Sequence, residues 1–113
     1  MPHFIIEGSS NLIAELEPST CLDLVFKSAM DSRLFREKDI KLRIAMFDDY
    51  RVGLAGADFI HVEVQWLSGR SDSEKKALST GILSDLSKIV PLEASVTVEV
   101  RDMSRDSYSK KAI

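Results

Sequence analysis

The sequence has few of the residues that build cross-linked, phosphate-binding or membrane-spanning proteins. It contains one cysteine, Cys21, which excludes an internal disulfide and predicts a buried thiol in a reducing compartment. Its five glycines form no G-x-G-x-x-G array of the kind that cradles a dinucleotide. No apolar run approaches the roughly 20 residues that span a bilayer, and no basic-then-apolar secretion signal opens the chain. We therefore expect a cytoplasmic protein that does not enter a membrane.

Positive charge is not in excess either. The chain has 15 Lys and Arg against 18 Asp and Glu, a formal net charge of -3, so it lacks the basic surplus that binds nucleic-acid phosphates. Its histidines, His3 and His61, stand at no metal-binding spacing, and a lone cysteine adds no pair of ligands. We expect no metal site. Hydrophobic residues make up 44% of the 113, which suits a single domain over residues 1–113.

Hydrophobic periodicity predicts four strands and two helices. Alternating apolar residues indicate strands over residues 2–7, 40–47, 59–67 and 95–101. Helical spacing indicates a first helix that begins near residue 19 or 20, where Thr20 and Asp23 resemble a capping pair, and fades between residues 32 and 35. A second helix begins at a Ser71–Glu74 capping box and ends at Pro91. The remaining segments are a turn at 8–11, a connector at 12–18, a loop at 48–56 and a polar tail at 103–113.

This order of elements predicts an α+β fold built from a duplicated β-α-β unit. Each unit pairs parallel strands through a right-handed crossover, and together they form a four-stranded sheet with two helices on one face. The other face mixes apolar and charged side chains: His3, Ile5, Glu7, Lys41, Arg43, Phe47, His61, Glu63, Gln65, Thr97, Glu99 and Arg101. A solvated face has this composition, but so does a face buried in an oligomer with its charges paired, which we favour.

The N-terminus carries the most informative pair of residues, Met1-Pro2. An initiator methionine before so small a ring is usually removed, which leaves Pro2 with a secondary α-amine held rigidly on the backbone. An α-amine titrates near about 8, and burial or a nearby cation lowers its pKa. A neutral amine near pH 7 is a competent general base. Met-Pro also opens many ordinary proteins, but here a predicted strand follows at once and would hold the terminus in place.

The run Pro2-His3-Phe4-Ile5-Ile6-Glu7 resembles the start of the 5-carboxymethyl-2-hydroxymuconate isomerases, members of the tautomerase superfamily that use an amino-terminal proline. The likeness continues through residues 40–44, 59–62 and 69–71 and covers most of the chain at a low level. It implies the same duplicated β-α-β fold, assembled as a homotrimer whose sheets surround a central core. It also implies a cofactor-free proton shift that turns a 2-hydroxy dienoic acid into its 2-oxo enone, in aromatic-compound catabolism such as homoprotocatechuate degradation.

The resemblance assigns roles to individual residues. Pro2 would be the base and then the acid. Arg70 directly precedes the capped helix start, so its guanidinium and the unpaired helix amides could meet one substrate carboxylate. Without the resemblance, an ordinary surface arginine would be the preferred interpretation of Arg70.

Two further cations match basic positions of the family. Arg43 could bind a second carboxylate or polarise the 2-oxo group, or it could form an ion pair with Glu63 or Glu99 inside the trimer. Lys41 stands where relatives carry arginine, and lysine lacks the planar two-pronged grip. Its contact with substrate is therefore looser, or the substrate differs.

Other conspicuous side chains carry less weight. We assign His3 and His61 no catalytic role, and Trp66 alternates with valines as a core residue does. Phe47 and Tyr50 could line a pocket. Two other functions stay open: a tautomerase of another small oxo acid, which Lys41 leaves possible, and a non-catalytic trimeric binding protein of the same fold, which a retained Met1 would favour.

Overall fold

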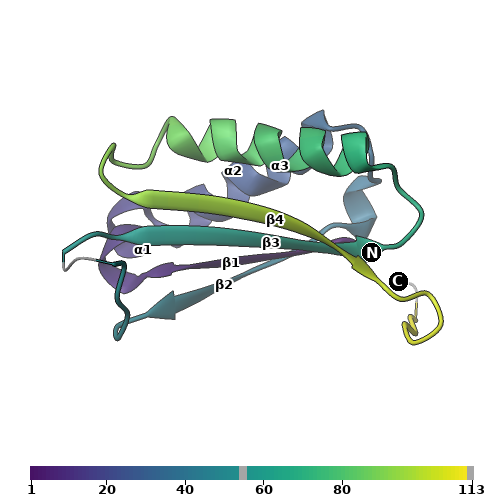
Figure 1. Cartoon of the computed structure of the whole chain (residues 1–113), viewed down its shortest axis with the longest axis horizontal. Coiled ribbons are helices and arrows are strands. Elements are labelled where there is room, and N and C mark those ends of the chain that lie inside the picture. Colours follow the sequence, from purple (N-terminus) through teal and green to yellow (C-terminus); the bar gives the residue numbers. More distant parts are fainter. Residues whose placement is uncertain (54–55, 112–113) are drawn as a thin grey trace.

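The computed structural model describes residues 1–53 and 56–111. A four-stranded sheet carries helices α2 and α3 side by side on one face (Figure 1). Along the chain the elements are β1 (His3–Ser9), α1 (Ser10–Leu16), α2 (Pro18–Asp31), the 3-10 turn η1 (Glu37–Asp39), β2 (Lys41–Phe47), β3 (Phe59–Leu67), α3 (Asp72–Ser87) and β4 (Ser95–Met103). Parts of the predicted 48–56 loop and 103–113 tail, residues 54–55 and 112–113, lie outside the described residues.

The strand order is β2-β1-β3-β4, and its directions confirm the predicted duplication. β1 pairs in parallel with β2, and β3 pairs in parallel with β4, so each half is a β-α-β unit. The two halves join where β1 runs antiparallel to β3, with His3 opposite both Lys41 and Gln65. The N-terminus therefore begins at the centre of the sheet, where neighbouring strands hold it on both sides.

The segment after β1 differs from the prediction. Residues 10–16 form helix α1, whereas a turn and a connector were expected there. This helix buries Leu12 and Ile13 at its centre, but it is too short to show helical periodicity in the sequence. Gly8 permits its approach to the sheet, because a Cβ at this position would lie 2.8 Å from Ile13 Cδ1 and 2.9 Å from Phe59 O.

Helix α2 also begins earlier than predicted. Its first residue is Pro18, whose fixed φ and missing N–H suit the first turn of a helix. Glu17 turns the chain between the two helices with φ 74°. Thr20 lies inside the helix, so the predicted capping pair with Asp23 is wrong.

The capping box at the start of α3 is confirmed. Ser71 Oγ accepts from the backbone N–H of Glu74 at 3.1 Å, and the Glu74 carboxylate accepts from the Ser71 N–H at 3.0 Å. The predicted alternation along β3 is confirmed as well, because its even-numbered residues are buried and its odd-numbered ones are not. Cys21 is fully buried, as expected of a small apolar residue.

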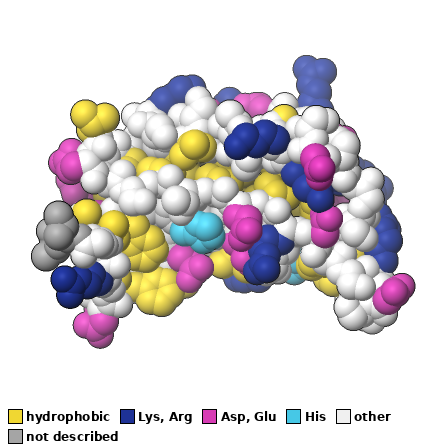
Figure 2. Space-filling view, viewed as in Figure 1, with side chains coloured by type: hydrophobic (Ala, Val, Ile, Leu, Met, Phe, Trp, Pro, Cys, Tyr) yellow, Lys and Arg dark blue, Asp and Glu magenta, His cyan; other side chains and the backbone are white. Residues whose placement is uncertain are grey.

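The sheet face opposite the helices is open in the single chain. It presents the mixed set predicted from the sequence, and Figure 2 shows acidic, basic and histidine side chains among hydrophobic ones over the region of the strands. Within this face Arg101 lies 3.4 Å from a Glu63 carboxylate oxygen and 3.8 Å from one of Glu99. Among the described residues, no helix is both long enough and apolar enough to cross a membrane.

Candidate active site

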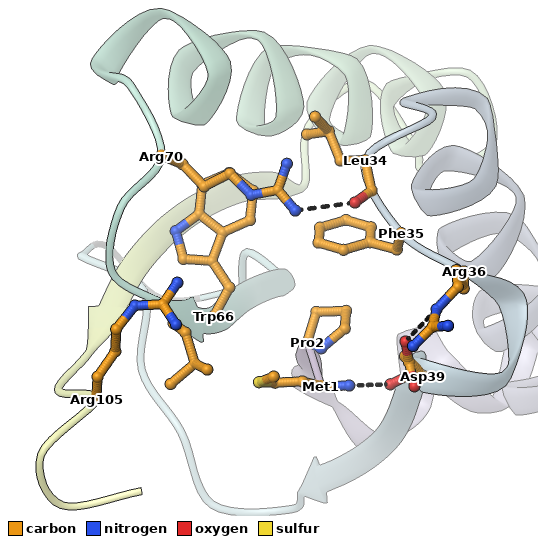
Figure 3. Close-up of a pocket in the computed structure, with 10 residues that line it drawn as sticks. Met1, Pro2, Leu34, Phe35, Arg36, Asp39, Trp66, Arg70 and Arg105 are labelled. Atoms are coloured by element: carbon orange, nitrogen blue, oxygen red, sulfur yellow. Dashed lines mark hydrogen bonds and ion pairs between the residues drawn. The ribbon is translucent and has the colours of Figure 1, made fainter.

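A pocket of about 300 Å³ opens at the end of the sheet where β1 begins (Figure 3). Pro2 lies at its base, between a wall from the segment after α2 and a wall from the end of β3. The lining residues are Met1, Pro2, Leu34, Phe35, Arg36, Asp39, Trp66, Leu67, Arg70 and Arg105. Four separate segments therefore build one cavity around the N-terminus.

Backbone contacts hold the N-terminus firmly in this pocket. Pro2 is buried, and its carbonyl oxygen accepts from the N–H of Lys41 at 3.1 Å. The α-amine of Met1 donates to the carbonyl oxygen of Asp39 at 2.6 Å. Lys41 Nζ donates to the same oxygen at 3.1 Å. Two amines thus share one acceptor beside Pro2.

This arrangement lowers the pKa of the α-amine. Burial, followed by the hydrogen-bonding and charge effects of Lys41, lowers the pKa of the Met1 amine from 8.0 to about 5. Lys110 lowers this pKa slightly, and the Asp39 carboxylate opposes the shift. An amine in this setting is neutral at pH 7 and has a free lone pair.

The opposite side of the pocket is formed around Arg70. Its Nη2 donates to the carbonyl oxygen of Leu34 at 2.9 Å. Its guanidinium carbon lies 5.3 Å from the ring centroid of Trp66 and 5.7 Å from that of Phe35. The Glu74 carboxylate approaches only to 3.9 Å. Two aromatic faces and one carbonyl therefore orient a guanidinium whose charge is only weakly paired.

Local sequence explains where Arg70 stands. Gly69 turns the chain at the end of β3 with φ 120°, a conformation that favours glycine. Ser71 caps α3 immediately afterwards. Arg70 is thus placed between a tight turn and a helix start, and its side chain is 36% exposed. It is directed along the pocket wall toward Leu34 (Figure 3).

Two more guanidinium groups border the same pocket. Arg36 Nε lies 3.2 Å from the Asp39 carboxylate, an ion pair at the pocket rim. Arg105, from the segment after β4, donates its Nε to the carbonyl oxygen of Ser68 at 2.8 Å. The pocket therefore offers several cations and a hydrophobic aromatic wall, which suits an organic anion.

The described part of the chain contains no cluster of side chains that could bind a metal ion. Residues 1–53 and 56–111 contain no group of three or more His, Cys, Asp or Glu side chains placed to hold a metal ion. The pocket's own side chains are mainly guanidinium and apolar groups, which are not metal ligands.

A family model described as 5-carboxymethyl-2-hydroxymuconate isomerase matches residues 2–111. The chain belongs to this family. Family members are isomerases, and the chain is an isomerase with the tautomerase fold.

Solved structures share that fold. A 5-carboxymethyl-2-hydroxymuconate isomerase from Deinococcus radiodurans R1 is 20% identical with a TM-score of 0.87, covering 99% of this chain and 90% of its own. A 5-carboxymethyl-2-hydroxymuconate delta-isomerase is 15% identical with a TM-score of 0.80, covering 98% and 87%. A fused 4-OT wild type asymmetric trimer is 14% identical with a TM-score of 0.75, covering 98% and 94%. No curated protein matches the chain.

Only some of the site residues that the sequence analysis proposed for this isomerase lie in the pocket. Pro2 and Arg70 line one pocket, and Lys41 reaches its edge through Asp39. Arg43 lies elsewhere, on the open sheet face, where its Nη1 is 3.2 Å from His3 Nδ1. Within one chain Arg43 is not among the ion pairs of the described residues, so its expected pairing with Glu63 or Glu99 concerns only an assembled trimer.

His3 is a hydrogen-bonded structural residue in the isomerase chain, as its strand position suggested. Its Nε2 lies 3.1 Å from the Tyr108 hydroxyl, on the other side of the ring from Arg43. Burial, then the charges of Arg43 and Lys41, lowers the pKa of His3. The ring is therefore neutral at pH 7 and links β1 to the C-terminal segment.

Sequence reasoning missed most of the isomerase pocket wall. Trp66 is a core residue, 2% exposed, as predicted, yet one of its ring faces also supports Arg70. Phe35 was placed only at the fading end of a helix, and Arg105 in a polar tail. None of these carries a local signal, because each reaches the pocket through tertiary packing.

Phe47 and Tyr50 do not line this pocket. They lie at the opposite end of the sheet, where their ring centroids are 6.4 Å and 5.5 Å from that of Phe59. Tyr50 also donates its hydroxyl to the Asp58 carboxylate at 2.6 Å. Their partial exposure reflects an aromatic cluster beside the β2–β3 loop.

Proposed function

We propose that this isomerase, with Met1 removed, uses Pro2 to convert 5-carboxymethyl-2-hydroxymuconate into its 2-oxo enone, in cytoplasmic catabolism of aromatic compounds. The observation that carries the proposal is that Pro2 shares one pocket with Arg70. In the chain that retains Met1, the Pro2 nitrogen belongs to a peptide bond and has no basic lone pair. Removal of Met1 is therefore a condition of the mechanism.

The proton shift needs one base that later acts as an acid. The Pro2 nitrogen removes the proton of the 2-hydroxyl group, and the O–H electron pair forms the C=O bond. The displaced π electrons move along the diene to a distant carbon, which takes the proton back from Pro2. No atom is gained or lost, and no oxidant or cofactor is needed.

The setting of the α-amine supports this role. Burial and Lys41 lower the pKa of the Met1 amine. Pro2 is the next residue, is itself buried and accepts from the Lys41 N–H through its carbonyl oxygen, so we expect burial and Lys41 to act on the Pro2 amine in the same direction once Met1 is removed. A lowered pKa keeps the base neutral at pH 7. It also makes the protonated form a stronger acid, which favours return of the proton to carbon.

The substrate carries several carboxylates, and cations are proposed to hold them. Arg70 would bind one, helped by the amides at the start of α3. Its stacking against Trp66 and Phe35 would keep the guanidinium oriented before substrate arrives. Lys41 would bind at the pocket edge. Arg43, which lies on the open face, would contact substrate only where a neighbouring subunit completes the pocket.

The proposed assembly is a homotrimer of single domains spanning residues 1–113. The half-exposed Ile5 and the Arg101–Glu63 ion pair on the open sheet face suit burial against other copies. A solved structure of this fold is described as a trimer. Light scattering that gave three times the 12.6 kDa of one chain would support this state, and a monomer would refute it.

A second candidate uses Pro2 on another small oxo acid. Lys41 favours it, because an ammonium group gives a single-point contact where a guanidinium would grip a carboxylate at two points. In that case the pocket would process an enol with fewer carboxylates.

The deciding experiment follows ketonisation of 5-carboxymethyl-2-hydroxymuconate by ultraviolet absorbance. The protein must first be shown by intact mass to lack Met1. Efficient turnover, abolished in a preparation that retains Met1, is the expected result. Absence of turnover with Pro2 free would reject this substrate and leave the second candidate, which enols with one and two carboxylates then test.

A further inference from the structure

Of the guanidinium groups that line the pocket, Arg105 is the one without a carboxylate partner among the described residues. Arg36 lies 3.2 Å from the Asp39 carboxylate, and Arg70 lies 3.9 Å from that of Glu74. Arg105 is in none of the ion pairs formed by residues 1–53 and 56–111. Its Nε donates to the Ser68 carbonyl oxygen at 2.8 Å, and no residue in the described ranges accepts from its two terminal nitrogens.

The fold places this guanidinium at a defined point. β4 pairs with β3 up to the Leu67–Met103 register, and the Ser68 N–H donates to Met103 O at 3.1 Å. The chain after β4 is therefore held beside the turn that begins α3. A Cβ at Gly69 would lie 3.5 Å from Arg105 Nη2, so the guanidinium packs directly on the glycine backbone.

The same turn thus presents Arg70 and seats Arg105. In Figure 3 Arg70 extends above Trp66 and Arg105 lies below and to the left of it, while Pro2 lies to the right; all four residues line the pocket. A molecule whose reacting hydroxyl meets Pro2 can extend one acidic group toward each arginine. An enol with a single carboxylate can use only one of the two.

We propose that Arg105 is a specificity-determining residue that binds a second substrate carboxylate and so selects polycarboxylate enols over monocarboxylate enols. The inference rests on the proposed function, because it takes Pro2 and Arg70 as the reacting and first binding groups. A purely structural Arg105, one that only ties the C-terminal segment to Ser68, would change stability without any discrimination between substrates.

The test uses protein lacking Met1 and compares Arg105→Ala and Arg105→Lys with the wild type. The two enols are 5-carboxymethyl-2-hydroxymuconate, with three carboxylates, and phenylenolpyruvate, with one. Arg105→Ala should lower kcat/KM for the first at least about tenfold, mainly through KM, the scale of one charge-assisted hydrogen bond at an accessible site. The same variant should keep kcat/KM for phenylenolpyruvate within about twofold of the wild-type value. Arg105→Lys, which keeps the charge but not the planar grip, should fall between.

Arg51→Ala is the matched control. Arg51 also donates its Nε to a backbone carbonyl, that of Gly53 at 3.1 Å, but it follows β2 at the far end of the sheet (Figure 1). Arg51→Ala should leave kcat/KM unchanged for both enols. Three results would overturn the inference. Arg105→Ala could lower kcat/KM equally for both enols, or it could leave kcat/KM for the tricarboxylate enol unchanged. Arg51→Ala could also show the same selective loss as Arg105→Ala.

A binding measurement separates this inference from the proposed function. Calorimetric titration with propane-1,2,3-tricarboxylate, which cannot react, should show at least about tenfold weaker binding to Arg105→Ala than to the wild type. Suppose that the wild type bound the tricarboxylate more tightly than Arg105→Ala but turned over no enol. The proposed isomerase mechanism would then be rejected, and the proposed anion site at Arg105 would still be supported. Normal turnover with unchanged tricarboxylate binding in the variant would reject Arg105 alone.

Discussion

The guanidinium of Arg70 lies over the indole ring of Trp66, with its central carbon 5.3 Å from the ring centroid. The indole is itself fixed, because its Nε1 donates to the Asp102 carboxylate at 3.0 Å and Lys75 Nζ donates to the same carboxylate at 2.7 Å. A buried residue of β3 thus connects an ion pair on the surface to the orientation of a pocket arginine. Fixed cations bind an anion more tightly than mobile ones, because less side-chain entropy is lost on binding.

Replacing Trp66 should therefore weaken substrate binding through Arg70. Trp66→Leu removes the aromatic face and should raise KM about threefold to tenfold, the range of one cation–π contact in a partly desolvated site. Trp66→Phe keeps a ring and should have a smaller effect on KM. Steady-state kinetics of both variants checks this, with thermal unfolding measured alongside because each change also disturbs the core.

A double-mutant cycle distinguishes positioning from general damage. If Trp66 acts through Arg70, Trp66→Leu should add little to the KM of an Arg70→Ala enzyme. Full additivity of the two changes would show that Trp66 affects the pocket by some other route.

Arg70→Ala should raise KM about tenfold or more with kcat changed much less. The reason is that a carboxylate held in both ground state and transition state contributes uniform binding. Arg70→Lys should recover part of the loss, since it restores charge but not geometry. An unchanged KM would make Arg70 a structural arginine whose role is its bond to Leu34 O.

Pro2→Ala should lower kcat at least about a hundredfold, the lower range for loss of a positioned general base. Alanine still leaves an α-amine, but a primary one without the rigid ring. The fold and the oligomer mass should be retained, because the contact of residue 2 with the sheet uses its backbone carbonyl. Equal turnover by protein of confirmed mass would remove Pro2 from the mechanism.

Lys41→Gln should move the acid limb of the pH profile of kcat/KM to higher pH. After burial, Lys41 is the largest cause of the lowered pKa of the Met1 amine. If it acts in the same way on the Pro2 amine that Met1 removal exposes, loss of Lys41 raises the pKa of the Pro2 amine. The neutral, active form of the amine then requires a higher pH. Lys41→Arg keeps the cation and should leave the limb near its original place. A limb that does not move in Lys41→Gln would show that another group titrates there.

Much of the fold could be predicted because its signals are local. The alternation of Ile60, Val62, Val64 and Trp66 marks β3, and Ser71 with Glu74 marks the start of α3, whatever packs around them. Helix α1 was missed because its seven residues are too few for a periodic stripe. Its formation depends on burial of Leu12 and Ile13 against the sheet, where Gly8 leaves room.

The candidate site was only partly predictable for the same reason. Pro2 was proposed from the Met1-Pro2 start and Arg70 from a resemblance concentrated in short motifs, whereas Phe35 and Arg105 lie in segments with no motif. Arg43 shared the basic pattern of the family, yet its strand position directs it to the open face.

The sequence by itself determined the four strands and the two long helices α2 and α3, and it placed a proline at the start of the first strand. These properties depend on side-chain size, period and capping chemistry within a few residues. Only the tertiary structure decided that Pro2, Phe35, Trp66, Arg70 and Arg105 share one pocket. Strand register and helix packing bring together groups that are far apart in the chain, and no local preference encodes those long-range distances.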